Sequence, residues 1–214
     1  MKIKFLKAAI VGLVFSISSF AHAGLITTNG GSAVGGFSSS EVYGQSFLVG
    51  IDNVLDSVQL TGRSTNGVNQ GVIYELFKWD DALNRVVNGS LFTTSGSLIA
   101  SNSLLDINIM TGGWELITGQ KYIFSMRHDD ANGSGNWGFG ASGTNDYIDG
   151  GFNYSQITSN RYLNNSWTAN HGGVSRDLHI QMNFSASSIP EPSTLAIFAL
   201  GMIGLASRQF KKQS

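Results

Sequence analysis

The segment from Leu178 to Phe184 alternates strictly between apolar and polar residues. Leu178, Ile180, Met182 and Phe184 occupy every second position, and His179, Gln181 and Asn183 lie between them. Side chains of a β-strand point alternately to its two faces, so this pattern predicts a strand with one face in a core. Residues 121–127 repeat the pattern after a Thr-Gly-Gln turn, and predict a second half-buried strand.

The rest of the central region also favours strands. Residues 72–79 are apolar on both faces, as in a central strand covered by a second layer. Further short candidates are residues 43–49, 58–61, 97–100, 104–109 and 114–117. No stretch keeps a 3.6-residue period long enough for a useful helix, so any helix should be a short turn. The expected fold is all-β, an antiparallel β-sandwich of jelly-roll type.

The N-terminal segment has the three parts of a secretory signal peptide. Lys2, Lys4 and Lys7 precede an apolar run over residues 8–20. Ala21 and Ala23 supply the small residues that signal peptidase accepts, which predicts cleavage before Gly24. The run is shorter than the roughly 20 residues of a spanning helix, so cleavage is favoured over an uncleaved anchor.

The C-terminal segment is also built in three parts. Pro190, Glu191 and Pro192 form a rigid acidic break, and an apolar run over residues 194–206 predicts a short single transmembrane helix. The basic residues Arg208, Lys211 and Lys212 follow it. Positive charge beside a membrane segment stays in the cytoplasm, so both ends predict that residues 24–189 are exported.

This C-terminal segment resembles the PEP-CTERM sorting signal of Gram-negative bacteria. The resemblance implies recognition by exosortase, an intramembrane processing enzyme, and transient anchoring in the inner membrane. Delivery to the cell surface or to the exopolysaccharide outside the cell would follow.

The region between the two terminal segments also resembles the jelly-roll-like ectodomains that often precede such tails. The residues that carry this likeness are Tyr43–Phe47, Leu55–Val58, Val72–Trp79, Gly119–Tyr122, Trp137–Phe139, Tyr147–Phe152 and Asp177–Phe184. They are strand and turn signatures, so they speak for the fold more than for a function. The predicted organisation is a signal peptide over residues 1–23, a sandwich over 24–187 and a sorting region over 188–214.

The composition of the predicted sandwich excludes several classes of partner and chemistry. Residues 24–187 hold seven Lys or Arg against thirteen Asp or Glu, a net charge of −6 that argues against nucleic acid as a partner. Cysteine is absent, which excludes thiol catalysis and disulfide cross-links. No His-x-His or His-Glu-x-x-His pair suggests zinc, and no cofactor is expected.

Candidate catalytic and metal-binding groups are sparse. The glutamates before the sorting motif are Glu41, Glu75 and Glu115, and nothing in their spacing pairs two of them for glycoside hydrolysis. Asp130, Asn132 and Ser134 resemble the start of a calcium loop, but its twelfth position lacks the required glutamate. A glycine-rich turn is the favoured interpretation there, and a structural calcium ion the alternative.

Aromatic residues give the remaining candidate site. Trp137, Tyr147 and Trp167 lie in connections rich in Gly, Asn and Ser, where an exposed ring could stack on a sugar. Core packing is the rival role, and it is expected for Trp79 and Trp114. The sequence thus predicts a non-catalytic surface or matrix protein, with signal peptidase, exosortase and exopolysaccharide as partners. A carbohydrate-binding module is the alternative, and a glycan hydrolase a weaker one.

Overall fold

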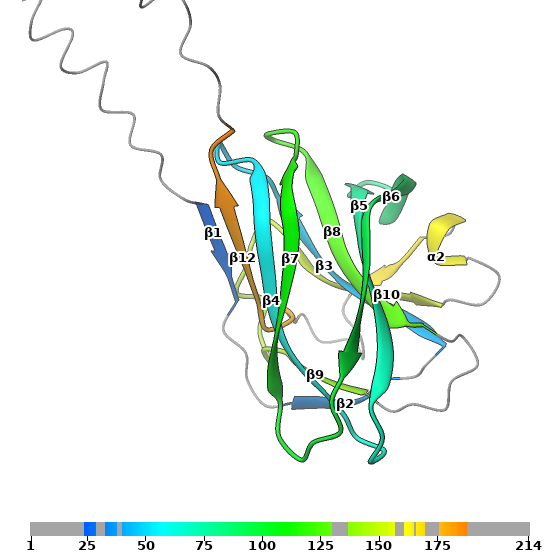
Figure 1. Ribbon diagram of the computed structural model, residues 1–214. Coiled ribbons are helices and arrows are strands. Elements are labelled where there is room, and N and C mark those ends of the chain that lie inside the picture. The colour runs from blue at the N-terminus through cyan, green and yellow to red at the C-terminus, as the bar shows by residue number, and fades with distance from the viewer. Residues whose placement is uncertain are drawn as a thin grey trace, which may run out of the picture.

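A computed structural model describes residues 24–28, 33–37, 40–129, 137–156, 161–164, 166–169 and 176–187, which form two antiparallel sheets (Figure 1). Sheet A contains β1 (Gly24–Thr27), β2 (Ala33–Phe37), β4 (Val54–Ser64), β7 (Leu105–Glu115), β9 (Trp137–Gly140) and β12 (Ile180–Ser185). Sheet B contains β3 (Glu41–Leu48), β5 (Gln70–Asp80), β6 (Arg85–Leu98), β8 (Lys121–His128), β10 (Gly151–Gln156) and β11 (Thr168–Ala169). The described helix is α2 (Arg161–Asn164), a single turn. The predicted all-β class with two antiparallel sheets is therefore confirmed.

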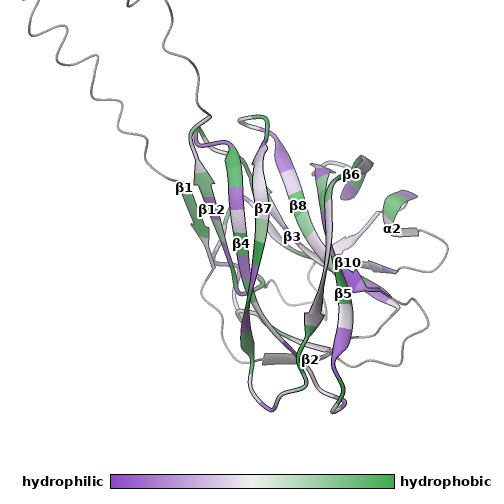
Figure 2. Cartoon of the chain, viewed as in Figure 1, coloured by the Kyte–Doolittle hydropathy of each residue, from purple (hydrophilic) through white to green (hydrophobic). Residues whose placement is uncertain are grey.

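The main core lies between the two sheets. β12 contributes Ile180, Met182 and Phe184, each at most 3% exposed, which confirms the alternation read from the sequence. Phe47 of β3 packs its ring against Phe184, and Tyr74 of β5 stacks on Phe124 of β8. In Figure 2 the colour along β4 changes between green and purple, as expected for a strand with one face in this core.

Sheet B is covered on its outer face as well. α2 and Trp167 pack on that face and form a second apolar cluster. Its buried members are Val42, Phe77, Trp79, Val86, Ile123, Tyr162 and Trp167. The expectation that residues 121–127 are half-buried is wrong, because Ile123 and Ser125 point away from the main core and are nevertheless 0% exposed. The expectation that residues 72–79 are covered on both faces is confirmed.

Two edge strands are longer than the sequence pattern indicated. β6 runs from Arg85 to Leu98, whereas the sequence predicted a strand only near its end, over residues 97–100. The rest of β6 was missed because an edge strand rich in Ser, Thr and Gly has little alternation of apolar and polar residues. β7 joins two segments that were predicted separately. Gly112 and Gly113 connect them with φ values of 81° and 79°, in a bulge opposite β4. Glycine reaches this left-handed region without the strain that a Cβ would cause.

Both ends of the described domain lie at the same end of sheet A (Figure 1). β1 pairs antiparallel with β12, and Gly24 lies opposite Phe184. The sandwich therefore begins at the residue where signal-peptide cleavage is predicted, and its last strand ends at Ser185. Among the described residues no helix is long and apolar enough to span a membrane, and the predicted transmembrane segment lies outside them.

Replacing Tyr74 with phenylalanine is expected to raise stability. The Tyr74 hydroxyl is buried and has no hydrogen-bond partner among the described residues, and burial raises the pKa of Tyr74 to about 12. Tyr74→Phe removes this unpaired group, so the free energy of unfolding should rise by about 1 kcal/mol in urea denaturation. Tyr43→Phe is the matched control, because the Tyr43 hydroxyl donates to Glu41 and its loss should lower stability by a similar amount. A Tyr74→Phe protein as destabilised as the control would contradict this account.

Candidate functional site

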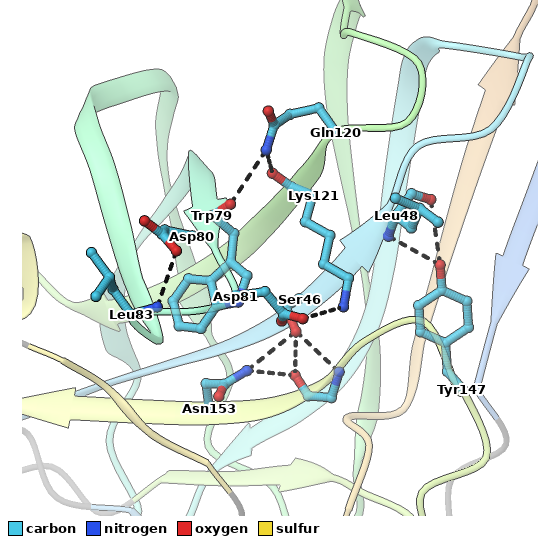
Figure 3. A network of polar contacts seen from close by, with 11 residues as sticks. Ser46, Leu48, Trp79, Asp80, Asp81, Leu83, Gln120, Lys121, Tyr147 and Asn153 are labelled. Carbon is cyan, nitrogen blue, oxygen red and sulfur yellow. Dashed lines mark hydrogen bonds and ion pairs between the residues drawn. The ribbon is translucent and has the colours of Figure 1, made fainter.

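A polar groove crosses the outer face of sheet B where β3, β5 and β8 meet the loop before β10 (Figure 3). It consists of two cavities, of about 180 and 480 Å³, that share Trp79, Asp81 and Lys121. We call the two cavities together the sheet-B groove.

An ion pair divides the sheet-B groove. Lys121 Nζ lies 2.9 Å from Asp81 Oδ2, with 24% of the lysine side chain and 63% of the aspartate side chain exposed. Lys121 is the first residue of β8, and Asp81 follows β5 in the turn to β6. Gln120 donates from Nε2 to the carbonyl oxygens of Trp79 and Lys121, which fixes the two strand ends beside each other.

The floor of the smaller cavity is a network of short polar side chains (Figure 3). Ser46 of β3 donates to the Gly151 carbonyl oxygen at 3.2 Å and accepts from the Gly151 amide at 3.1 Å. Asn153 of β10 donates to Ser46 Oγ and to the Gly151 carbonyl oxygen. The groove thus places hydrogen-bonding side chains beside a paired cation and carboxylate, the chemistry that recognises hydroxyl-rich molecules.

One wall of the smaller cavity is the loop between β9 and β10, and Asp177 holds this loop in place. Asp177 is 0% exposed, and its carboxylate accepts from Gln45 Nε2 at 2.7 Å. It also accepts from the amides of Asp146 and Tyr147 at 2.6 and 2.8 Å. Burial raises the pKa of Asp177, although these three hydrogen bonds act in the opposite direction. A buried carboxylate with several partners keeps a loop in one conformation.

The structure corrects the predicted sugar-stacking residues. Trp137 lies in β9 at 0% exposure, where it stacks on His128 and meets the edge of Phe139. Trp167 is 2% exposed, and its indole NH donates to the Tyr162 carbonyl oxygen. Core packing, the rival role, therefore applies to both tryptophans, because Trp137 belongs to the main core and Trp167 to the second apolar cluster.

Tyr147 and Trp114 are the two aromatic candidates that remain partly exposed. Tyr147 is half-buried, and its hydroxyl both accepts from and donates to the backbone of Leu48. Trp114 was expected in the core but is 39% exposed, because it follows the Gly112–Gly113 bulge at the edge of sheet A. Sequence reasoning also missed the sheet-B groove, whose residues come from five separate segments with no motif of their own.

The other predicted sites fall largely outside the described residues. This applies to Asp130, Asn132 and Ser134, to Ala21 and Ala23, to the Pro190–Pro192 motif and to the basic residues at 208, 211 and 212. Over the described ranges, no group of three or more His, Cys, Asp or Glu side chains could hold a metal ion. His128, the last residue of β8, is 5% exposed, and its Nε2 lies 2.7 Å from Gln70 Oε1.

The described residues form a two-sheet β-domain with a groove on the outer face of sheet B, and the chain has no cysteine. Residues 188–212 match the PEP-CTERM protein-sorting motif, so the chain carries this sorting signal directly after the domain. No curated protein matches the chain.

Two solved structures from clostridia align with parts of this chain. A clostridial cysteine protease after propeptide cleavage aligns with 77% of this chain at 14% identity and a TM-score of 0.52. The alignment covers 40% of that protein. The cysteine protease and lectin-like domains of a surface layer associated protein of Clostridium difficile align with 69% of this chain and 33% of their own, at 16% identity and a TM-score of 0.47. At 14% identity the likeness to the first of these structures concerns the fold alone.

Replacing Asp177 with asparagine should destabilise the domain by about 2 kcal/mol. An amide cannot accept all three hydrogen bonds, so at least one buried donor loses its partner. Denaturant unfolding measures the change, and the exposed Asp149→Asn variant should remain within about 0.5 kcal/mol of the parent.

The same variant tests the direction of the Asp177 pKa. A raised pKa means that the folded state binds the proton more tightly, so the contribution of Asp177 to stability falls as pH rises through this range. The stability difference between parent and Asp177→Asn should therefore shrink from the ordinary aspartate pKa upward. A difference that grows with pH would show that the hydrogen bonds outweigh burial.

Proposed function

We propose that this chain is an exported, non-catalytic protein of the cell surface or extracellular matrix. In this proposal exosortase sorts it through its PEP-CTERM motif in a Gram-negative bacterium, and it associates with exopolysaccharide. The observation that carries the proposal is the match at residues 188–212, which begins one residue after the described domain ends at Ser187. A folded domain that is complete before the motif can be released or transferred without losing any strand.

The arrangement of the domain supports export by both terminal segments. Gly24 and Ser185 lie at the same end of sheet A, so a signal peptide and a membrane segment would leave the domain side by side. Signal peptidase cleaving before Gly24 would leave β1 intact at the new N-terminus.

We also propose that the sandwich is of jelly-roll type. Its support is the strand order, because β3-β8-β5-β6 in one sheet faces β2-β9-β4-β7 in the other. The chain passes between the sheets at most connections, with β5 and β6 forming a hairpin within sheet B. This is the order of a double Greek key.

Several contacts favour a non-catalytic role. Glu75 accepts from Arg127 Nε at 2.8 Å and is 6% exposed, so this buried carboxylate is committed to an ion pair. Glu115 accepts a hydrogen bond from Ser187 at the surface. The clostridial protease of similar fold is a cysteine enzyme, whereas this chain has no cysteine.

Binding of exopolysaccharide within the sheet-B groove is the second candidate function. It is favoured by the Lys121–Asp81 pair, the partly exposed cation and carboxylate between the two cavities. In this proposal the carbohydrate would bind in the sheet-B groove and not at Trp137 or Trp167, whose rings are buried. Hydrogen bonds from charged groups, rather than stacking, would then supply the affinity.

Removing the sorting motif should change the destination of the protein and leave its fold intact. Deleting residues 188–214 removes no described strand, so thermal unfolding should be unchanged. Cell fractionation and surface labelling should find the truncated protein outside its normal compartment. A Pro190→Ala, Glu191→Ala, Pro192→Ala triple variant keeps the apolar and basic parts and separates recognition from anchoring. Normal surface display of both variants would refute exosortase sorting.

Replacing Lys121 with alanine tests the groove. If the Lys121 cation donates to a sugar hydroxyl, its loss should weaken binding of the producer's exopolysaccharide by roughly 10-fold or more in calorimetry. Arg85→Ala is the matched control, because it removes one exposed positive charge from a position outside the groove. Equal weakening by the two variants would indicate general charge attraction instead of a site.

A further inference from the structure

The end of the sandwich from which both chain ends leave carries exposed aliphatic side chains. We call it the terminal pole, and it consists of Gly24 and Leu25, loop 49–53, loop 116–120 and residues 185–187. Leu25, Ile51 and Ile117 are 56%, 84% and 61% exposed. An aliphatic side chain held in water at these fractions gains free energy when an apolar phase covers it.

The two loops of the terminal pole are held together by their backbones. The amides of Val49 and Gly119 donate to the carbonyl oxygens of Gln120 and Val49 at 3.1 and 2.9 Å. Asn53 both accepts from the Leu116 amide and donates to the Leu116 carbonyl oxygen. Ile51 and Ile117 therefore project from a fixed pair of neighbouring loops, so covering them costs little ordering entropy.

An apolar cavity of about 240 Å³ lies at the same pole. Leu25, Ile26, Leu48, Ile51 and Phe184 line it, together with the backbone of Gly24 and Gly50 and the side chain of Asp52. Leu25 and Ile51 thus stand at one opening, next to the first described residue of the domain.

Chain length places this pole close to a membrane. Only six residues separate Ser187 from Thr194, the first residue of the apolar run, and the seven Cα-to-Cα steps from Ser187 to Thr194 span at most about 25 Å when fully extended. With that run inserted, the pole cannot move farther than this from the bilayer surface. A weak contact then suffices, because the tether gives the pole a high effective concentration at the bilayer.

We propose that the terminal pole is a membrane-contacting surface, on which Leu25, Ile51 and Ile117 enter the interface of the bilayer that holds the C-terminal segment. The proposal rests on the anchoring step of the proposed function. In this orientation the long strands of both sheets run away from the membrane surface, and the β4–β5 turn lies at the end of the domain farthest from the bilayer. Asp52 and Glu115 lie beside the three aliphatic residues, so the contact favours zwitterionic over anionic lipid.

Single cysteines give a direct test, because the chain has none of its own. Full-length protein carrying Ile51→Cys or Ile117→Cys is labelled with an environment-sensitive fluorophore and reconstituted into phosphatidylcholine vesicles. Val68→Cys is the matched control, since Val68 is 57% exposed in the β4–β5 turn at the opposite end. Emission at positions 51 and 117 should shift to the blue and be quenched by spin-labelled lipid, and emission at 68 should do neither.

Flotation of the vesicles separates this proposal from the anchoring on which it rests. Protein that floats with the vesicles while positions 51 and 117 emit like position 68 would overturn the proposal and leave anchoring intact. Protein that does not float would overturn anchoring, and the proposal with it. Replacing half of the phosphatidylcholine with phosphatidylglycerol should reduce the blue shift, and a larger shift would contradict the expected lipid preference.

Discussion

The burial of aromatic and aliphatic side chains between the two sheets is the interaction on which this domain depends. The chain has no cysteine, so no disulfide limits the freedom of its unfolded state. Phe47, Phe124 and Phe184 fill the space between the sheets at 3% exposure or less. The two sheets hold their relative position through these contacts, and every loop at the ends of the sandwich depends on that position.

The second apolar cluster has a different consequence. By packing α2 and Trp167 on the outer face of sheet B, the chain buries Trp79 and Trp167 edge to face at 5.8 Å. This covering layer stops beside β10, and the sheet-B groove lies where the layer ends. The groove therefore exists because α2 and Trp167 cover only part of the outer face of sheet B. Its lining residues lie on the part that they leave uncovered.

The sequence predicted strands well where apolar and polar residues alternate along the chain, and poorly where they do not. β12 was found from Ile180, Met182 and Phe184, because burial of one face imposes a period of two. β8 was also found, although the structure buries both of its faces. β6 was mostly missed, since an edge strand that is largely exposed needs no such period. Trp137, Trp167 and Trp114 were misplaced for a related reason: a tryptophan in a polar stretch is buried or exposed according to distant residues that its neighbours in sequence do not reveal. The sheet-B groove was beyond sequence reasoning because β3, β5, β8 and β10 meet only in the folded chain.

The pairing of the first strand with the last has a consequence for how the domain folds during export. Thr28 donates its hydroxyl hydrogen to the carbonyl oxygen of Ile180, a partner 152 positions later. A chain that crosses the membrane from its N-terminus cannot make such a contact until almost all of it has emerged, and non-local pairing of this kind makes folding slow. β1 can therefore pair with β12 only after nearly the whole domain is available, and sheet A is completed just before the sorting motif at residues 188–212. Completion of sheet A and arrival of the sorting signal are in this way tied to the same moment of synthesis.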